Sequence, residues 1–462
     1  MALLPFTEST DGSCHRRYHG RSWTWHLFVT ILILGSLSSH HSVVYGQHLS
    51  SQYRFDNQEY EILHARDIYY DSIPRVALQS LLSANDGHVR HDVEQALGGT
   101  PQAFCMTLCG NKGKKSSDEN INQDRTFVVV SKQEPQHDEY YLQACGVLDG
   151  HGEVGHDVSE FGRMEITRGL LAQVELWQTQ KASLTPTIVA DFMESLLVDV
   201  DARVPKKASS RGGATVSFVV RIGSHVYTVN AGDSQSFIAA MITTTTSADA
   251  DKTDKTPTRE VVLLHTTRLD KPDLPSEKER LLEAGAASVT EASDEDDARV
   301  WNEWIDEETG QRQSYGLAMS RGIGDRHATG VIANPLTESW SIEDLRRQAK
   351  EMIESKRKES ASGEGECVVS ENGDTETCQT QESVNVDDIE LFAVSSTDGI
   401  LDFSTPDGVV EMIGTYLHHE NDPQQVFLAA QQLFYDSAQG WNEAYGGSYR
   451  DDMGLSVIAL TR

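Results

Sequence analysis

A length of 462 residues is sufficient for one large domain or two ordinary ones, and a hydrophobic content of 38% is sufficient for a substantial core. The 71 acidic residues outnumber the 39 Lys and Arg residues, and the net charge of −32 excludes nucleic acid and anionic membrane surfaces as natural partners. The same charge repels phosphorylated substrates, so a site that acts on phosphate in this chain needs bound cations.

The N-terminal segment carries a targeting signal. Three arginines between residues 16 and 21 precede the apolar stretch 27–37, and this arrangement is typical of a secretory signal peptide. A membrane-spanning helix needs about 20 apolar residues, more than this stretch contains. Residues 1–46 are therefore predicted to be a signal peptide cleaved before Gln47, or alternatively an uncleaved signal anchor. Either one directs the chain into the secretory pathway, where it is secreted, lumenal or membrane-anchored.

Residues 47–100 are polar and weakly patterned, and we interpret them as an N-terminal extension of a main domain that covers residues 101–462. Within this domain, β-branched apolar runs predict strands, and apolar residues three and four apart predict helices. Gly223 and Ser224, between two such runs, indicate a hairpin. In the first half of the domain the expected elements are strands at 126–130, 140–148, 214–222, 225–230 and 237–242, and a helix at 186–204.

The second half of the domain continues with strands and helices. The expected elements are strands at 260–265, 390–396 and 455–460, and helices at 276–284 and 423–439. Two low-complexity segments, near residues 243–258 and 350–388, are interpreted as solvated loops inserted into one domain. Consecutive strands linked by hairpins favour antiparallel sheets covered by helices, an α+β fold, over a doubly wound parallel fold.

Six cysteines are too few for a disulfide-built scaffold in a chain of this length. Cys14 belongs to the N-terminal segment, and Cys145, inside an apolar run, is predicted to be a buried small hydrophobe. An oxidising compartment would permit disulfides among the remaining four, but the sequence does not assign their pairing. These four are Cys105, Cys109, Cys367 and Cys378.

Acidic residues stand where several of the predicted strands begin or end. Asp124 precedes one strand, Asp149 and Asp398 each follow one, and Asp451 precedes the closing strand. Because a rigid sheet displays such residues at its edge, these carboxylates are expected to converge on a cation that prefers oxygen ligands, such as Mg²⁺ or Mn²⁺. A single Asp-Gly pair is more often a turn, so the inference depends on the whole set.

Six short motifs follow one another along the domain. They are DGHG at 149–152, RGGATV at 211–216 with VNAGDS at 229–234, LDKP at 269–272, LAMSRGIGD at 317–325, STDGILD at 396–402 and RDD at 450–452. In this order they resemble the PPM, or type-2C, family of metal-dependent serine/threonine protein phosphatases over about residues 101–462.

The resemblance implies a four-layer αββα sandwich, in which helices flank two antiparallel β-sheets and the metal ions lie at one end between the sheets. It also implies a monomeric enzyme that hydrolyses phosphoserine and phosphothreonine in phosphorylated protein substrates. In this family a water molecule that bridges two ions, either Mg²⁺ or Mn²⁺, attacks phosphorus in line without a covalent enzyme intermediate.

Roles for individual residues follow from the same resemblance. Asp149 would bridge both metal ions, and the main-chain carbonyl of Gly150 would complete the second site. Asp398 and Asp451 would ligate the first ion. His151 would act as the general acid that protonates the departing serine or threonine oxygen, because an alkoxide is a poor leaving group.

Two further aspartates have supporting roles by resemblance. Asp124 would hold metal-bound waters, and Asp233 would ligate the weaker third ion that parts of the family bind. The arginine that grips the phosphate in the best-known members is missing, because Glu119 stands at that spacing, so the substrate-binding residues are left unassigned. Three lysines lie further upstream, at positions 112, 114 and 115, and Asp452 stands where the commonest pattern has Asn.

Two alternatives to an active protein phosphatase remain open. A catalytically weak or silent member of the family would act as a phosphoprotein-binding or regulatory protein, and a metal-dependent phosphohydrolase would act on small molecules. Retention of Asp149, Asp398 and Asp451 favours the protein phosphatase over the silent member, because binding alone does not require three metal ligands. Comparing peptide with metabolite substrates separates the remaining case.

Overall fold

The computed structural model describes residues 47–55, 58–66, 99–100, 103–112, 121–131, 139–244, 258–293, 296–305, 310–363, 384–417 and 425–461. The predicted signal peptide or anchor at residues 1–46 lies outside the described residues, and so do Cys367 and Cys378. Within the described ranges, no helix has both the length and the apolar character that crossing a membrane requires.

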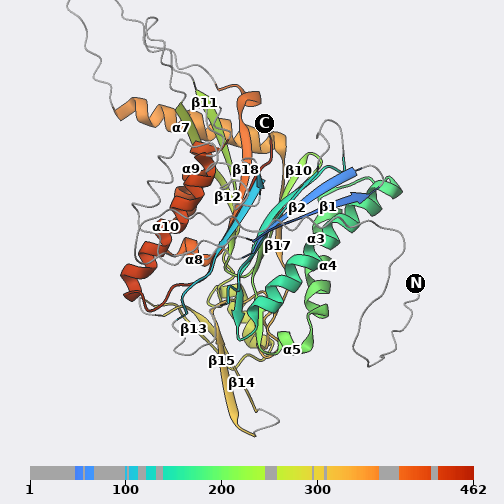
Figure 1. Ribbon diagram of the computed structural model, residues 1–462, viewed down its shortest axis with the longest axis vertical. Coiled ribbons are helices and arrows are strands. Elements are labelled where there is room, and N and C mark those ends of the chain that lie inside the picture. The colour runs from blue at the N-terminus through green and yellow to red at the C-terminus, as the bar shows by residue number, and fades with distance from the viewer. Residues whose placement is uncertain are drawn as a thin grey trace, which may run out of the picture.

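Two large sheets form the centre of the molecule (Figure 1). Neighbouring strands in both sheets run antiparallel. The first sheet has the strand order β1 (Gln47–Phe55), β2 (Gln58–Arg66), β5 (Arg125–Ser131), β6 (Leu142–Leu148), β9 (Val216–Ile222), β10 (His225–Ala231) and β17 (Leu336–Ser341). The second has the order β12 (Thr258–Thr266), β11 (Gln235–Thr244), β18 (Glu390–Ser396), β19 (Met453–Ala459), β4 (Ala103–Leu108) and β3 (Gly99–Thr100).

Helices cover the outer face of each sheet, as Figure 1 shows. The helices α3 (Gly155–Gln180) and α4 (Pro186–Arg203) pack on the first sheet. The helices α9 (Pro406–Tyr416) and α10 (Gln425–Tyr445) pack on the second. The order helix, sheet, sheet, helix confirms the predicted α+β, four-layer αββα sandwich.

A buried apolar cluster fills the space between the two sheets. Val128 and Cys145 from the first sheet contribute to it, together with Ile238 and Ala393 from the second. Two further clusters join each sheet to its helices, so every interface between layers contains an apolar cluster. Cys145 is fully buried in this position, which confirms its prediction as a small hydrophobe.

Particular residue types mark where helices begin and where the chain turns. At helix N-termini, side-chain hydroxyls accept hydrogen bonds from backbone amides that have no partner within the helix. The Thr185 hydroxyl accepts a hydrogen bond of 3.3 Å from the amide of Ile188, and Pro186 occupies the first position of α4. Thr405 caps α9 in the same way. Gly223 has a φ of 57°, which the tight turn of the predicted β9–β10 hairpin requires.

Smaller elements surround one end of the sandwich. A three-stranded sheet joins β7 (Gly150–Gly152), β8 (Gly212–Ala214) and β16 (Ile323–Gly324). A second one joins β13 (Ser288–Thr290), β14 (Arg299–Ile305) and β15 (Arg312–Leu317), next to α6 (Pro275–Glu283). Short helical turns occur at α5 (Lys206–Ser209), α8 (Asp398–Leu401) and η1 (Val386–Asp388).

The structure differs from the sequence prediction in the region expected to be an acidic loop. The first part of residues 350–388 belongs to the helix α7 (Ile342–Gly363), so the prediction of a solvated loop is wrong there. Leu345, Ala349 and Ile353 follow one another at helical spacing, and all three are buried in the cluster between the sheets. Their burial explains why a segment of polar composition is helical.

Part of the polar stretch 47–100, which was predicted to be an extension of the main domain, belongs to its first sheet. The first part of this stretch forms β1 and β2, which pair with each other and extend the first sheet through β5. Of the other low-complexity segment, near 243–258, the two ends belong to β11 and β12, and residues 245–257 lie outside the described ranges.

Candidate metal centre

Five aspartates predicted as site residues lie at one end of the sandwich. Because β5 and β6 are antiparallel, Asp124, before β5, and Asp149, after β6, lie at the same edge of the first sheet. In the second sheet Asp398, after β18, and Asp451, before β19, lie together for the same reason. Asp233 stands in the turn between β10 and β11. We call these five residues the acidic cluster.

The members of the acidic cluster are close enough to perturb one another. Burial, and then the charges of Asp124, Asp398 and Asp451, raise the pKa of Asp149 well above its usual value. Burial, and then the charges of Asp233 and Asp451, do the same to the pKa of Asp398. Burial, and then the charge of Asp452, raise the pKa of Asp124 to about 8. The structure therefore gathers these side chains into one electrostatic unit.

The acidic cluster contains buried oxygens that bind nothing in the described part of the chain. One carboxylate oxygen (Oδ1) of each of Asp124, Asp233 and Asp398 is buried without a hydrogen-bond partner among the described residues. Buried, unpaired carboxylate oxygens are unfavourable unless a cation compensates them. Their hard-oxygen chemistry fits Mg²⁺ or Mn²⁺. The described side chains, however, do not include three His, Cys, Asp or Glu ligands already arranged around one point.

A lysine contacts part of the acidic cluster. The ammonium nitrogen of Lys112 lies 2.9 Å from Asp451 Oδ1 and 3.0 Å from Asp452 Oδ2, and it donates to Gln123 Oε1 at 3.3 Å. Burial alone would lower the pKa of Lys112, but the charges of Asp451, Asp452 and Asp149 raise it above its usual value. Lys112 is therefore a built-in counter-charge for one side of the cluster.

Asp452 has a structural role at the same point. Its two carboxylate oxygens accept hydrogen bonds from the amides of Gly110, at 2.6 Å, and Gln123, at 2.9 Å. The backbone around it is also held by a two-residue bridge between Asn111 and Arg450. Two acceptor oxygens are needed for this pair of amides, which explains an aspartate where the related pattern has Asn.

A second lysine faces the other side of the cluster. Lys271 Nζ lies 2.8 Å from Asp233 Oδ2. Behind it, buried Asp270 accepts from the amide of Gly232 at 3.1 Å and pairs with Arg268 at 2.7 Å, which fixes the turn that carries Asp233. The sequence reasoning assigned no role to either lysine, although Lys271 belongs to one of the six motifs.

His151 lies on β7, directly after the Asp149-Gly150 pair. Its ring nitrogen Nε2 lies 2.9 and 2.8 Å from the two carboxylate oxygens of Asp325, and its other ring nitrogen, Nδ1, is buried without a partner among the described residues. Burial alone would lower the pKa of His151, but the charge of Asp325 and the hydrogen bond to it raise the pKa above its usual value. A protonated imidazole beside the acidic cluster can act as a proton donor.

Two residues that stabilise the centre, Thr397 and Asp325, were not identified from the sequence. The hydroxyl of Thr397 donates to Asp124 Oδ2 at 2.7 Å, and so joins the two sheets. Asp325 lies in the LAMSRGIGD motif and Thr397 in the STDGILD motif, but a motif gives no contact partner. Asp325 is 174 positions from His151, so only the fold could reveal that pair.

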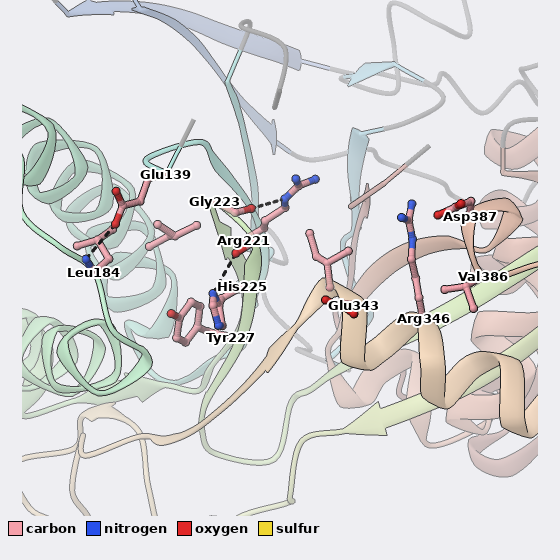
Figure 2. A pocket seen from close by; sticks show the side chains of 13 residues that line it. Glu139, Leu184, Arg221, Gly223, His225, Tyr227, Glu343, Arg346, Val386 and Asp387 are labelled. Atoms are coloured by element: carbon pink, nitrogen blue, oxygen red, sulfur yellow. Dashed lines mark hydrogen bonds between the residues drawn. The ribbon is translucent and has the colours of Figure 1, made fainter. Parts of the chain in front are cut away.

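A separate pocket of about 780 Å³ lies at the opposite end of the first sheet (Figure 2). The β9–β10 turn forms part of its wall, and this turn lies beside the beginning of β6, whereas Asp149 follows the end of that strand. Figure 2 shows Arg221 donating to the carbonyl of Gly223 within the pocket. None of the residues of the acidic cluster lines this pocket.

Comparisons with known proteins agree on one family. A family model described as "Protein phosphatase 2C" matches residues 123–434. Probable protein phosphatase 2C 41 of Arabidopsis thaliana is 29% identical over 258 residues, which cover 52% of this chain and 63% of that protein. The match therefore spans less than two thirds of that relative's length. Probable protein phosphatase 2C 34 of the same plant is 25% identical over 332 residues, which cover 68% of this chain and 71% of that protein.

Solved structures of other proteins also match this chain. A serine-threonine phosphatase 2C from Toxoplasma gondii matches with a TM-score of 0.48 and 15% identity, and the match covers 79% of this chain and 96% of that one. A sex determining protein of C. elegans matches with a TM-score of 0.44 and 14% identity, over 83% of this chain and 70% of that one.

Proposed function

Because the chain belongs to the protein phosphatase 2C family, we propose that it is a metal-dependent serine/threonine protein phosphatase that acts at the acidic cluster. The observation that supports this most is the burial of several carboxylates with unpartnered oxygens beside a histidine that is held by its own aspartate. A structural ion-pair network would leave no such oxygens, whereas a site for divalent cations requires them.

The residues that would hold the metal ions are those of the acidic cluster. Asp149 and the carbonyl of Gly150 would serve one ion, Asp398 and Asp451 would serve another together with Asp149, and Asp233 would contribute to a weaker third. Asp124 would orient coordinated waters. When bound, Mg²⁺ or Mn²⁺ neutralises phosphate charge and makes water a better nucleophile.

The protein's own residues supply the remaining functions. His151 would donate a proton to the serine or threonine oxygen as the phosphorus–oxygen bond breaks, and general acids of this kind contribute about 10²–10⁴-fold. Lys112 and Lys271 are the described lysines that contact the acidic cluster, and they would reduce its repulsion of a phosphorylated substrate. We further propose that the protein acts on phosphorylated proteins, that it is a monomer and that it enters the secretory pathway. The last of these rests on the N-terminal sequence alone.

A second candidate function is supported by the same lysines. Lys112 already neutralises Asp451, and Lys271 already neutralises Asp233, so the cluster is partly compensated without any metal ion. This arrangement favours weak metal binding and hence a catalytically weak member that binds or regulates phosphoproteins.

Phosphate release from a phosphothreonine peptide tests the proposal. The full chain is assayed with EDTA, with Mg²⁺ and with Mn²⁺, beside Asp149→Asn and the control Asp199→Asn, which alters an exposed carboxylate on α4. Metal-dependent release that Asp149→Asn abolishes and Asp199→Asn retains supports the phosphatase. A folded protein that binds metal but releases no phosphate supports the regulatory alternative. Release from small phosphate esters but not from peptides supports a metabolite phosphohydrolase.

A further inference from the structure

The carboxylate of Asp325 lies directly against the imidazole of His151. Both of its oxygens are within 2.9 Å of Nε2, and the hydroxyl of Tyr315, on β15, donates to Oδ1 at 3.2 Å. The Asp325 side chain is only 1% exposed, so its charge is shielded from water. A buried carboxylate that accepts hydrogen bonds from two donors has one defined orientation. Because the His151 ring is bound to this carboxylate, the orientation of the ring is defined as well.

The backbone of Asp325 is held in a conformation that L-residues rarely adopt. Its φ of 48° is in the left-handed region, which is unfavourable for a residue with a side chain. Its amide donates to the carbonyl of Gly212 at 3.2 Å, and the preceding amide, of Gly324, donates to Asp201 Oδ1 at 2.7 Å. The surrounding contacts therefore enforce this conformation and so place the carboxylate behind the ring.

The space that the carboxylate occupies depends on a glycine. A Cβ at position 213 would lie 2.0 Å from Asp325 Oδ2, so only glycine permits the carboxylate to approach β8 this closely. Gly213 is also the residue that pairs with His151 across β7 and β8. The strand that carries the histidine and the strand that admits the aspartate are therefore neighbours in one small sheet.

We propose that Asp325 is the positioning residue for His151, and that Tyr315 fixes Asp325 in turn. Asp325 holds Nε2–H, which leaves Nδ1 as the nitrogen that gives its proton to the leaving oxygen. As the phosphorus–oxygen bond breaks, the bonding electrons stay on that oxygen, the Nδ1 proton moves to it, and a neutral imidazole with Nε2–H on Asp325 remains. This inference rests on the proposed phosphatase function.

A comparison of leaving groups tests the role of Asp325. Asp325→Asn keeps the shape of the side chain, and Asn tolerates the left-handed region better than most residues. Its amide cannot hold the ring as the carboxylate does. We expect kcat for phenyl phosphate and for a phosphothreonine peptide to fall by about 10²-fold, the lower end of a general acid's contribution. We expect kcat for p-nitrophenyl phosphate to change by less than threefold, because p-nitrophenolate departs without protonation.

The matched control is Asp199→Asn, which removes an exposed carboxylate from α4, where it pairs with Arg203 and takes no part in holding Asp325. The ratio of the two aryl phosphate rates should stay at its wild-type value in this variant. Equal losses on both substrates in Asp325→Asn, or a changed ratio in Asp199→Asn, would overturn the proposal, because the first result is that of a merely structural residue and the second would show that loss of any nearby carboxylate changes the ratio. Should Asp325→Asn fail to fold, Tyr315→Phe provides the same comparison, with an expected selective loss of a few-fold.

Ring-nitrogen NMR separates this inference from the proposed function. The ¹⁵N signals of His151, identified by their absence in His151→Gln, should show Nε2 carrying the proton in the neutral ring of the wild type. The opposite tautomer would refute the positioning role even in an active enzyme. A wild type that hydrolyses no phosphate ester but shows the expected tautomer would refute the phosphatase while leaving the Asp325–His151 geometry established.

Discussion

Lys112 and Asp451 form an ion pair at a carboxylate that is predicted to bind metal, with 2.9 Å between the ammonium nitrogen and Oδ1. The pair joins the segment that follows β4 to the segment that precedes β19. Because a lysine and a divalent cation would compete for the same oxygen, the strength of this pair sets part of the metal affinity.

Lys112→Met should therefore destabilise the metal-free protein and strengthen its response to metal. Loss of the counter-charge leaves Asp451 and Asp452 facing each other, and a cost of about 1 kcal/mol corresponds to a fall in Tm of about 2–4 °C. The rise in Tm on adding Mg²⁺ should be larger than in the wild type. Lys278→Met, which removes a lysine on α6 that pairs with Glu291, is the control and should leave the metal response unchanged. An unchanged or smaller response in Lys112→Met would contradict the competition.

Asp398→Asn should have the opposite effect on the metal-free protein. The carboxylate of Asp398 is buried near Asp233 and Asp451, so its neutralisation relieves repulsion and should raise Tm in EDTA. The stabilisation by saturating Mn²⁺, about 2.7 kcal/mol when the ion is present at 100 times its Kd, should largely disappear. Differential scanning calorimetry with and without Mn²⁺ measures both effects. A full metal-induced shift in Asp398→Asn would exclude this residue as a ligand.

Gly399→Ala should disturb the site through the backbone. A Cβ at position 399 would lie 1.9 Å from the carbonyl oxygen of Asp452. Because both clashing groups would belong to or be attached directly to the main chain, neither can avoid the clash by a change of rotamer. We expect a loss of about 1–3 kcal/mol or more in the free energy of unfolding, together with weaker metal binding. Gly408→Ala, whose Cβ would meet only the Thr405 hydroxyl at 3.3 Å, is the control and should be close to neutral. Urea titration of both variants decides the matter, and equal stabilities would count against the predicted clash.

Glu277 should make the protein sensitive to acid. Burial alone would raise the pKa of Glu277. Hydrogen bonds and charges from Arg321 and Arg280 outweigh burial and lower this pKa from 4.5 to about 2. The folded state has the lower pKa, so this stabilisation is complete above about pH 5 and is lost as the pH falls toward 2. It amounts to about 3 kcal/mol, because each pKa unit corresponds to about 1.4 kcal/mol.

The variant Glu277→Gln tests this dependence. Its free energy of unfolding should be lower than that of the wild type at pH 7, and the difference should shrink steadily when urea titrations are repeated toward pH 3. Glu279→Gln alters an exposed carboxylate on the same helix and serves as the control. A difference that stays constant with pH would mean that Glu277 contributes shape rather than charge.

Most strands could be predicted from the sequence because their apolar runs end in turn residues. The strand expected at 390–396 coincides with β18, and the hairpin at Gly223 formed as predicted. The helix α3 was missed, since Gly162 and Gly169 interrupt its pattern. These glycines permit close packing, because a Cβ would lie 2.6 Å from the Ile323 side chain at Gly162 and 2.4 Å from Leu196 at Gly169. Local preference was overruled there by tertiary contact.

The aspartates of the site could be placed from the sequence, but their partners could not. Asp124, Asp149, Asp398 and Asp451 adjoin strands, and antiparallel pairing brings strand ends together. The contacts of Lys112 and Asp325 depend on segments far apart in the chain, and neither residue type predicts its partner. These partners decide how much free charge the acidic cluster retains and which nitrogen of His151 is held by Asp325.

The place of β19 in its sheet has a consequence for biosynthesis. This strand lies between β18 and β4, although β4 precedes it by more than 300 positions. During synthesis on the ribosome, β4 emerges early, and it cannot pair with β19 until β19 has left the exit tunnel. The edge of β4 is exposed to other nascent chains during this interval. Shorter nascent chains should therefore depend on chaperones, and metal capture should begin only after β19 is inserted.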